Sequence, residues 1–270
     1  MRKQSIIGGA VVAGLMFTAG AVASGNRGVE IEGGGNDDSA SLDCPGGMSH
    51  LSHVFSESAN TFPGDPETDF EIVTTVEVDG FQVERVTFGT HTSTHIDAPL
   101  HFLGEPARSV DDLRADEFVW PAYVIDVRSR IAAPGDDDFQ LSVADVRAYE
   151  RRNGRIPRGA LVIIRTGWDD KFGTPAYDDP VAGFAGATVQ WMVDNRHIDA
   201  IGSDTYGPDA SSDPLFDATY TILANDRVAV PGLDNLGSMN ITGDIVIASP
   251  IRLQDGSGFQ VAPLACHGDD

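Results

Sequence analysis

The sequence predicts an α/β fold in a single domain, and two observations lead to that prediction. Short apolar runs typical of buried strands alternate with segments whose apolar residues recur at helical spacing. A hydrophobic content of 41% in 270 residues supplies one sizeable core or two modest ones, and no repeat or linker divides the chain after residue 42. The expected strands are 123–127, 160–164, 198–201 and 245–248, and the expected helices are 142–152 and 188–195.

A β-hairpin is expected just before residue 89. Residues 71–78 and 81–88 each alternate between apolar and polar side chains, and Asp79-Gly80 between them is a hairpin turn signal. This pair of strands leads the chain into the histidine-rich segment that follows.

The first expected helix has a local start signal. Ser142 occupies a cap position, with Asp145 three residues later. The residues expected to face the core are Val143, Val146 and Tyr149 in this helix, and Val189, Met192 and Val193 in the helix at 188–195.

The composition is strongly acidic. The chain carries 41 Asp and Glu against 18 Lys and Arg, which gives a formal net charge of -23. A negative potential of this size repels phosphate backbones and anionic lipid headgroups, and no cluster of Lys or Arg offsets it locally. Nucleic acid is therefore not an expected partner.

Residues 1–23 are predicted to be a signal peptide. Arg2 and Lys3 precede an apolar run from Ile6 to Val22, which ends in an A-x-A cleavage site at Ala21 and Ala23. The alternative is a membrane anchor, although a run of about 17 residues is at the short limit for spanning a bilayer.

Cleavage would leave an exported protein, periplasmic or extracellular, without a membrane segment. Residues 24–41 are mostly Gly, Asn, Asp, Glu and Ser, so they are expected to form a flexible polar spacer before a domain at 42–270. The two cysteines, Cys44 and Cys266, lie near the two ends of that domain. An exported protein permits a disulfide between them, but sequence alone leaves two unrelated thiols equally open.

The residues with metal-binding chemistry concentrate in one short segment. His91, His95, Asp97 and His101 lie within eleven residues, and imidazole and carboxylate are donors for Zn²⁺, Mn²⁺ or Fe²⁺. In a straight strand His91 and Asp97 would lie roughly 20 Å apart, so the segment must coil if one ion is to bind both. Helical spacing would place His91 and His95 on one face, although the threonines and Pro99 are unfavourable for a helix. The remaining histidines are expected to be core or surface residues: His50, His53, His197 and His267.

This segment resembles the signature H-x-G-T-H-x-D-x-P-x-H of the cyclase family, which includes bacterial kynurenine formamidases and isatin hydrolases. Residues 91–101 differ from that signature only at Ser93. The resemblance extends, in the right order, over roughly residues 50–255. Its further matches are Leu51-Ser52-His53, Pro63-Gly64-Asp65-Pro66, Arg165-Thr166-Gly167-Trp168, Ile201-Gly202-Ser203-Asp204 and Leu233-Asp234-Asn235-Leu236.

The resemblance implies a swivelling β/β/α fold, a homodimer or higher homo-oligomer, and a metal-activated water that attacks an amide, lactam or ester carbonyl. It makes His91, His95 and Asp97 the metal ligands and His101 the catalytic acid or base. This division of roles is chemically consistent, because a bound divalent ion activates water and a histidine titrates near neutral pH. Zinc and manganese suit the donors equally well.

Two departures from the family pattern bear on the metal site. The formamidase branch completes a second metal site with a His and a Glu, and these positions fall on Thr219 and Pro231. Neither residue replaces the lost ligand, so one metal ion is expected. Three carboxylates could complete its coordination on composition alone, namely Asp204, Asp209 and Asp226. At Ser93 the family has glycine. If that glycine provides a positive φ angle, Ser93 costs on the order of 1 kcal/mol there. If it lets the substrate approach the backbone, the Ser93 side chain narrows the pocket.

Trp168 follows Thr166-Gly167 after the end of the strand expected at 160–164, where loops gather around α/β sites. It is expected either to stack on an aromatic substrate or to pack as a half-buried residue.

The resulting prediction is an exported metal-dependent hydrolase of a non-peptide carbon–nitrogen bond, arylformamidase-like, that acts on a small N-formyl arylamine such as N-formylkynurenine or on a cyclic amide. Export argues against a role in cytosolic tryptophan catabolism. One alternative is a lactam or lactone hydrolase similar to isatin hydrolases. The other is a non-catalytic exported binding protein on the same fold.

Overall fold

The computed structural model describes residues 43–131 and 139–269. The expected signal peptide at 1–23 and the spacer at 24–41 lie outside the described residues. The described residues form one compact unit. No helix in the described part of the chain has the length and apolar composition needed to span a membrane.

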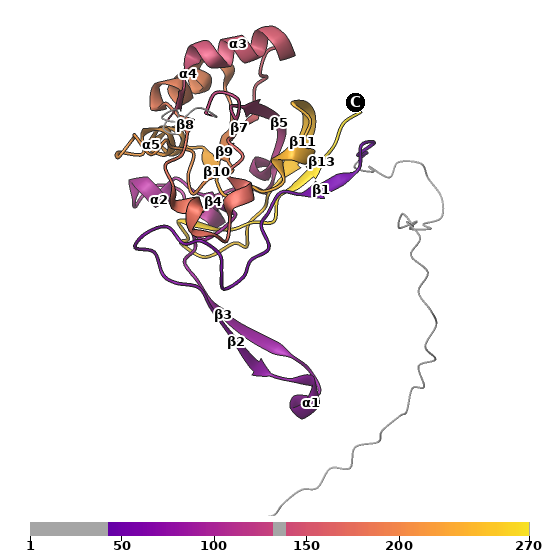
Figure 1. The fold of residues 1–270 in the computed structure, drawn as a ribbon. Helices are drawn as coiled ribbons and strands as arrows, with labels where there is room; N and C mark the ends of the chain where they lie inside the picture. The colour runs from indigo at the N-terminus through magenta and orange to yellow at the C-terminus, as the bar shows by residue number, and fades with distance from the viewer. Residues whose placement is uncertain (1–42, 132–138, 270) are drawn as a thin grey trace, which may run out of the picture. The chain divides into compact units, whose positions relative to one another are not determined.

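One mixed sheet organises the described residues (Figure 1). Its four central strands are parallel to one another, and antiparallel strands extend it on both sides. The predicted α/β class is therefore confirmed. In spatial order the nine strands are β1 (Met48–His50), β13 (Leu264–Cys266), β11 (Thr242–Ile247), β5 (Val119–Asp126), β7 (Leu161–Arg165), β9 (Ala200–Ser203), β10 (Val228–Val230), β4 (His95–Asp97) and β12 (Gly258–Gln260).

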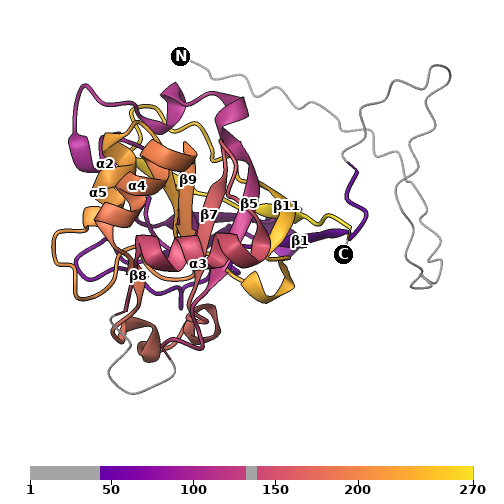
Figure 2. The same cartoon turned by 90° about the horizontal axis from the view of Figure 1, so that it is seen from above.

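Helices α3 (Val143–Asn153), α4 (Gly186–Arg196) and α5 (Asp217–Ala224) pack on one face of this sheet (Figures 1 and 2). The predicted capping box is present, because Ser142 Oγ accepts from the backbone of Asp145 and the Asp145 carboxylate accepts from the Ser142 amide at 3.0 Å. Alternation along β7 divides the core, with Val162 and Ile164 facing the helices and Leu161 and Ile163 facing the opposite side.

The shorter elements complete the chain. A separate two-stranded sheet pairs β2 (Asp69–Thr74) with β3 (Val83–Thr87), and another pairs β6 (Gln140–Leu141) with β8 (Gly183–Phe184). The short helical segments are α1 (Val76–Asp79), α2 (Leu100–Leu103), η1 (Val110–Asp112), η2 (Ala115–Phe118), η3 (Asp169–Lys171), η4 (Pro175–Asp178) and η5 (Leu236–Ser238).

The predicted hairpin forms, but its turn differs from the prediction. The first strand ends at Thr74 because α1 follows it, and the Asp79 carboxylate accepts from the Thr75 amide at 3.0 Å. Gly80 ends this helical turn with φ 81°, a left-handed conformation that suits glycine. Asp79-Gly80 therefore closes a short helix within a longer connection instead of forming a two-residue turn.

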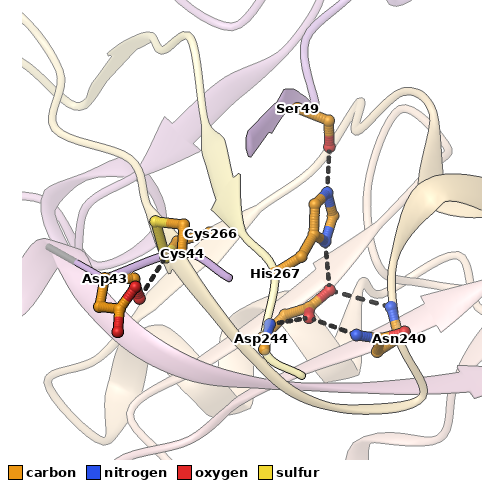
Figure 3. Close-up of a disulfide and its surroundings, with 8 residues drawn as sticks. Asp43, Cys44, Ser49, Asn240, Asp244, Cys266 and His267 are labelled. Carbon is orange, nitrogen blue, oxygen red and sulfur yellow. Dashed lines mark hydrogen bonds and ion pairs between the residues drawn. A yellow bond between two sulfur atoms is a disulfide. The ribbon is translucent and has the colours of Figure 1, made fainter. Parts of the chain in front are cut away.

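Cys44 and Cys266 are joined in a disulfide with their Cα atoms 5.1 Å apart (Figure 3). The bond fixes the start of the described chain to β13, which also pairs with β1. A buried polar network lies beside it, in which the His267 ring contacts the Asp244 carboxylate at 2.9 Å and Ser49 Oγ at 2.9 Å. Of the two possibilities that the sequence left open, a disulfide or two unrelated thiols, the disulfide is confirmed.

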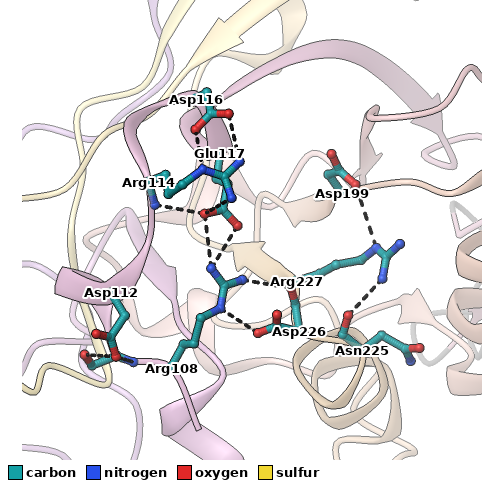
Figure 4. A network of polar contacts seen from close by, with 10 residues as sticks. Arg108, Asp112, Arg114, Asp116, Glu117, Asp199, Asn225, Asp226 and Arg227 are labelled. Carbon is teal, nitrogen blue, oxygen red and sulfur yellow. Dashed lines mark hydrogen bonds and ion pairs between the residues drawn. The ribbon is translucent and has the colours of Figure 1, made fainter.

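An arginine network holds the segment that follows α2 (Figure 4). Arg108 donates to the Asp226 carboxylate at 2.7 Å and to Glu117 at 3.0 Å, so it joins the loop after α2 to the loop after α5. Asp226 is therefore committed to this ion pair and does not line the site described below.

Breaking the disulfide is expected to lower the free energy of unfolding by about 3–5 kcal/mol, because the bond joins residues 222 positions apart and restricts the unfolded chain. Urea unfolding of a C44S/C266S variant and of the wild-type protein measures this difference. Reductant should lower the wild-type midpoint and leave that of the variant unchanged. Equal midpoints for the wild-type protein and the variant in the absence of reductant would contradict the prediction.

Candidate functional site

The motif at residues 91–101 folds as a turn, a short strand and a helical turn. Residues 89–94 turn back on themselves, with the Thr92 amide donating to the Gly89 carbonyl at 3.1 Å. β4 follows directly, and Pro99 precedes α2. The expectation that the segment coils is confirmed. It does not form the helix that the threonines and Pro99 disfavour, because His95 begins a strand and His91 lies in the turn before it.

β4 places two of the predicted ligands inside the sheet. It lies between β10 and β12, and His95 and Asp97 are only 4% and 3% exposed. A Cβ atom on Gly258 of β12 would lie 2.4 Å from Cε1 of His91, so only glycine lets that ring lie against the strand. The neighbouring strands therefore shape the space around the motif.

The three predicted ligands meet at the Asp97 carboxylate. Asp97 Oδ1 lies 2.8 Å from His91 Nδ1 and 3.2 Å from His95 Nε2. The His101 ring stacks on the His91 ring with centroids 3.7 Å apart. One ligand atom from each of His91, Asp97 and His101 lies within 4.8 Å of the others. All four sequence-predicted site residues therefore lie in one cluster.

The residues present fit a divalent metal ion. His95 Nδ1 lies 2.8 Å from the Ser93 carbonyl, which can only accept a hydrogen bond, so Nδ1 carries the proton and Nε2 offers its lone pair to the cluster. His91 Nε2 is held by Ser257 Oγ at 2.8 Å, which orients the other ring nitrogen toward Asp97. Two oriented imidazoles and one carboxylate are a donor set for Zn²⁺ or Mn²⁺.

The electrostatics of the cluster favour a charged carboxylate. Burial raises the pKa of Asp97, but His95 and His91 outweigh that effect and hold the pKa well below its ordinary value. Burial lowers the pKa of His95, yet Asp97 more than compensates and leaves it raised. His101 has a lowered pKa, because burial, with the neighbouring His91 and His95, outweighs the attraction of Asp97.

The cluster lies at one side of a cavity of about 490 Å³. Aromatic side chains form a continuous wall around it, in which each ring contacts the next with centroids 4.7 to 6.1 Å apart. Starting at His101, this wall comprises Phe102, Phe216, Phe62, Tyr206 and Tyr177. Such a lining suits an aromatic ligand.

Phe216 is held in an unusual backbone conformation, with φ 55°. This left-handed geometry is uncommon for a bulky residue, and such strain recurs at ligand clamps. The Asp213 carboxylate accepts from the amides of Leu215 and Asp217 at 3.1 and 2.8 Å, which fixes the loop. The strained loop therefore presents the Phe216 ring to the cavity.

The aromatic wall escaped sequence reasoning, because its members come from four segments that are far apart in the sequence. The aromatic candidate that the sequence offered, Trp168, is 8% exposed, donates to the Tyr177 carbonyl and does not line the cavity. Its packing alternative is therefore confirmed.

The structure also shows Thr219 and Pro231, which stand where the formamidase branch has the ligands of its second metal site. Thr219 lines the cavity, and its hydroxyl and amide both donate to Asp209. The Pro231 carbonyl accepts from the His95 amide at 3.3 Å. Burial raises the pKa of Asp209 to about 6, although the hydrogen bonds from Thr219 act against this. Asp204 is taken up by hydrogen bonds from Thr166 and the amides that follow it, away from the cavity.

Comparisons with known proteins agree with this geometry. The model of the Cyclase family matches residues 49–210. An isatin hydrolase of Roseibium aggregatum is 27% identical over 240 residues, which covers 83% of this chain and 90% of that protein. A kynurenine formamidase of Bacillus cereus is 38% identical over 217 residues, which covers 78% and 93%. The structure of isatin hydrolase A from Ralstonia solanacearum superposes with a TM-score of 0.75 at 28% identity, covering 82% of this chain and 92% of that one.

Replacing Ser93 with glycine is expected to stabilise the fold. Ser93 has φ 64°, a left-handed conformation that costs a residue with a Cβ atom about 1 kcal/mol relative to glycine. Thermal unfolding of Ser93→Gly should therefore show a higher midpoint than the wild-type protein, whereas Ser93→Ala, which keeps the Cβ atom, should not. A midpoint for Ser93→Gly at or below that of the wild-type protein would contradict this account.

Proposed function

The chain belongs to the Cyclase family, and from that membership we propose that it hydrolyses a non-peptide carbon–nitrogen bond of an aromatic amide with one divalent metal ion. His91, His95 and Asp97 would hold the ion, and His101 would move protons. The observation that carries this proposal is the meeting of the three ligands at Asp97 Oδ1 beside an aromatic-lined cavity.

The side chains around the cluster have separate roles in this proposal. A bound divalent ion supplies Lewis acidity toward the scissile carbonyl and toward water. The Ser93 carbonyl and Ser257 Oγ orient His95 and His91. His101 faces the cavity, and among the described residues no hydrogen bond occupies its ring nitrogens. It is therefore free to take a proton from water and deliver it to the leaving amine.

Two bonds are candidates for cleavage. The formamidase relatives favour an N-formyl arylamine, and the isatin hydrolase relatives favour a lactam ring. Both substrates place an aromatic ring next to the scissile bond, as the aromatic wall requires. A non-catalytic binding protein would not need the complete ligand set together with a His101 ring that makes no hydrogen bond within the described residues. An enzyme is therefore the better supported interpretation.

The protein is further proposed to be exported. The Cys44–Cys266 disulfide supports this, because such bonds persist in oxidising compartments. The signal peptide predicted at 1–23 would direct the export.

The first experiment measures metal and activity together. The protein should carry about one zinc or manganese ion per subunit by elemental analysis, since three ligands with open positions suit one catalytic ion. The H91A/H95A variant should lose the metal. His101→Ala should keep the metal and lose about 10²- to 10⁴-fold in kcat on formanilide or isatin.

Two results would refute the proposal. Either no metal binds after reconstitution, or His101→Ala hydrolyses the substrate as fast as the wild-type enzyme. His197→Ala is a matched control, because His197 ends α4 and does not line the cavity.

We also propose that the chain forms a homodimer through the hairpin arm, defined as residues 69–87. Aromatic contacts of Phe55 with Phe70 and Phe88 anchor the base of the arm. Its far end is apolar yet exposed, with Val76 60%, Val78 84% and Phe81 56% exposed. A two-stranded hairpin is only marginally stable alone, and a second copy of the arm would bury the same residues on both chains.

Charges placed on the tip of the arm are expected to yield monomers. The wild-type protein should have the mass of two chains by light scattering, and a V78D/F81D variant that of one chain, because buried carboxylates would lack partners. V54D/I251D is a matched control, since Val54 and Ile251 are 87% and 69% exposed outside the arm. A monomeric wild-type protein, or a dimeric V78D/F81D variant, would exclude the arm as the interface.

A further inference from the structure

The cavity of about 490 Å³ beside the histidine cluster is called the catalytic cavity below. Apart from histidines and tyrosines, the ionisable side chains that line it are all acidic. Six carboxylates line the cavity, and no lysine or arginine does so among the described residues. One of the six, Asp97, belongs to the cluster of proposed metal ligands. The other five are Asp65, Asp178, Asp179, Asp209 and Asp213.

Most of these charges are not neutralised by their neighbours. Tyr206 donates its hydroxyl to Asp178 at 2.6 Å, and hydroxyl and amide groups donate to Asp209 and Asp213. Such dipoles satisfy hydrogen bonds but leave the negative charge in place. Within the described residues, Asp179 is the one of these five that forms an ion pair with a lysine or arginine, with Lys171 Nζ at 3.6 Å.

The acidic lining is a property of this cavity and does not follow from the overall composition alone. A second cavity, of about 470 Å³, is lined by Arg128 and Arg165 as well as by Asp169, Asp170 and Asp234. The same acidic chain therefore places arginines in one cavity and excludes them from the other.

We infer that the catalytic cavity selects aromatic amides whose remaining substituents are neutral or cationic, and discriminates against those that carry a carboxylate. This inference rests on the proposed hydrolase function. A substrate carboxylate would meet several uncompensated negative charges without a basic partner, whereas an ammonium group would gain attraction both from them and from the aromatic faces.

Three matched substrates test this inference. They are formanilides that carry an aminomethyl, a carbamoylmethyl or a carboxymethyl group at the para position, which are cationic, neutral and anionic at pH 7. The wild-type, metal-loaded enzyme should show kcat/KM for the cationic substrate at least about 10-fold above that for the anionic one in 0.1 M salt. That ratio should shrink toward 1 in about 1 M KCl, because salt screens charges in an open cavity.

A pair of variants separates the cavity from the overall charge of the protein. D178N/D179N removes two carboxylates from the catalytic cavity and keeps their hydrogen-bond acceptors, so it should lower the cationic-to-anionic ratio severalfold. D169N/D170N makes the same change of charge in an adjacent pair that lines the second cavity, and it should leave the ratio unchanged. Equal effects of the two variants would attribute the preference to net charge and overturn the inference.

Failure of the inference can be distinguished from failure of the proposed function. Equal hydrolysis of all three substrates would overturn the inference and leave the hydrolase intact. If none is hydrolysed, the proposed function fails on these amides, and calorimetric binding of the three corresponding anilines still decides the question of charge. Tighter binding of the aminomethyl than of the carboxymethyl aniline would support the charge preference, and equal binding or none would overturn it.

Discussion

The buried carboxylate of Asp97 is the constraint on which the site depends. An ionised group that is 3% exposed requires compensation, and the chain provides it with two imidazoles, one from the turn before β4 and one from β4 itself. The surrounding structure follows from this pairing. The turn must bring His91 back over the strand, and β12 must carry glycine at 258 to leave space for its ring. The same arrangement that stabilises the charge in the folded chain is a donor set for a cation.

The elements around the cluster divide structural and chemical tasks. α3, α4 and α5 cover one face of the sheet and supply its apolar core, while the loops at residues 62–65, 177–181 and 206–216 supply the cavity. The ion pairs of Arg108 hold the segment after α2, and the Arg108 carbonyl accepts from the amide of Leu100, the residue before His101, at 2.9 Å. Chemistry thus lies on a short strand and its flanking turns, supported by a rigid sheet.

The sequence predicts the parts of this structure that depend on nearby residues. The capping box at Ser142 and Asp145 and the apolar runs of β5, β7, β9 and β11 are local signals, and the site cluster falls within eleven residues. The aromatic wall is not predictable in this way, because Phe62, Phe102 and Phe216 meet only through the topology of the sheet. The helical turn of α1 was missed because the hydrogen bond that the Thr75 amide donates to the Asp79 carboxylate outweighs the alternating pattern of the strand.

The corner of the cavity around Thr219 supports the proposal of a single metal ion on physical grounds. A second ion would require donors with free lone pairs, yet three donors already occupy Asp209, namely the Thr219 hydroxyl and the amides of Ala218 and Thr219. Burial raises the pKa of Asp209 to about 6, so its charge is less stable there than in water. Pro231 offers only its carbonyl, which accepts from the amide of His95. Hydrogen bonds thus occupy the acceptor atoms of Asp209 and Pro231 that a second ion would need as ligands.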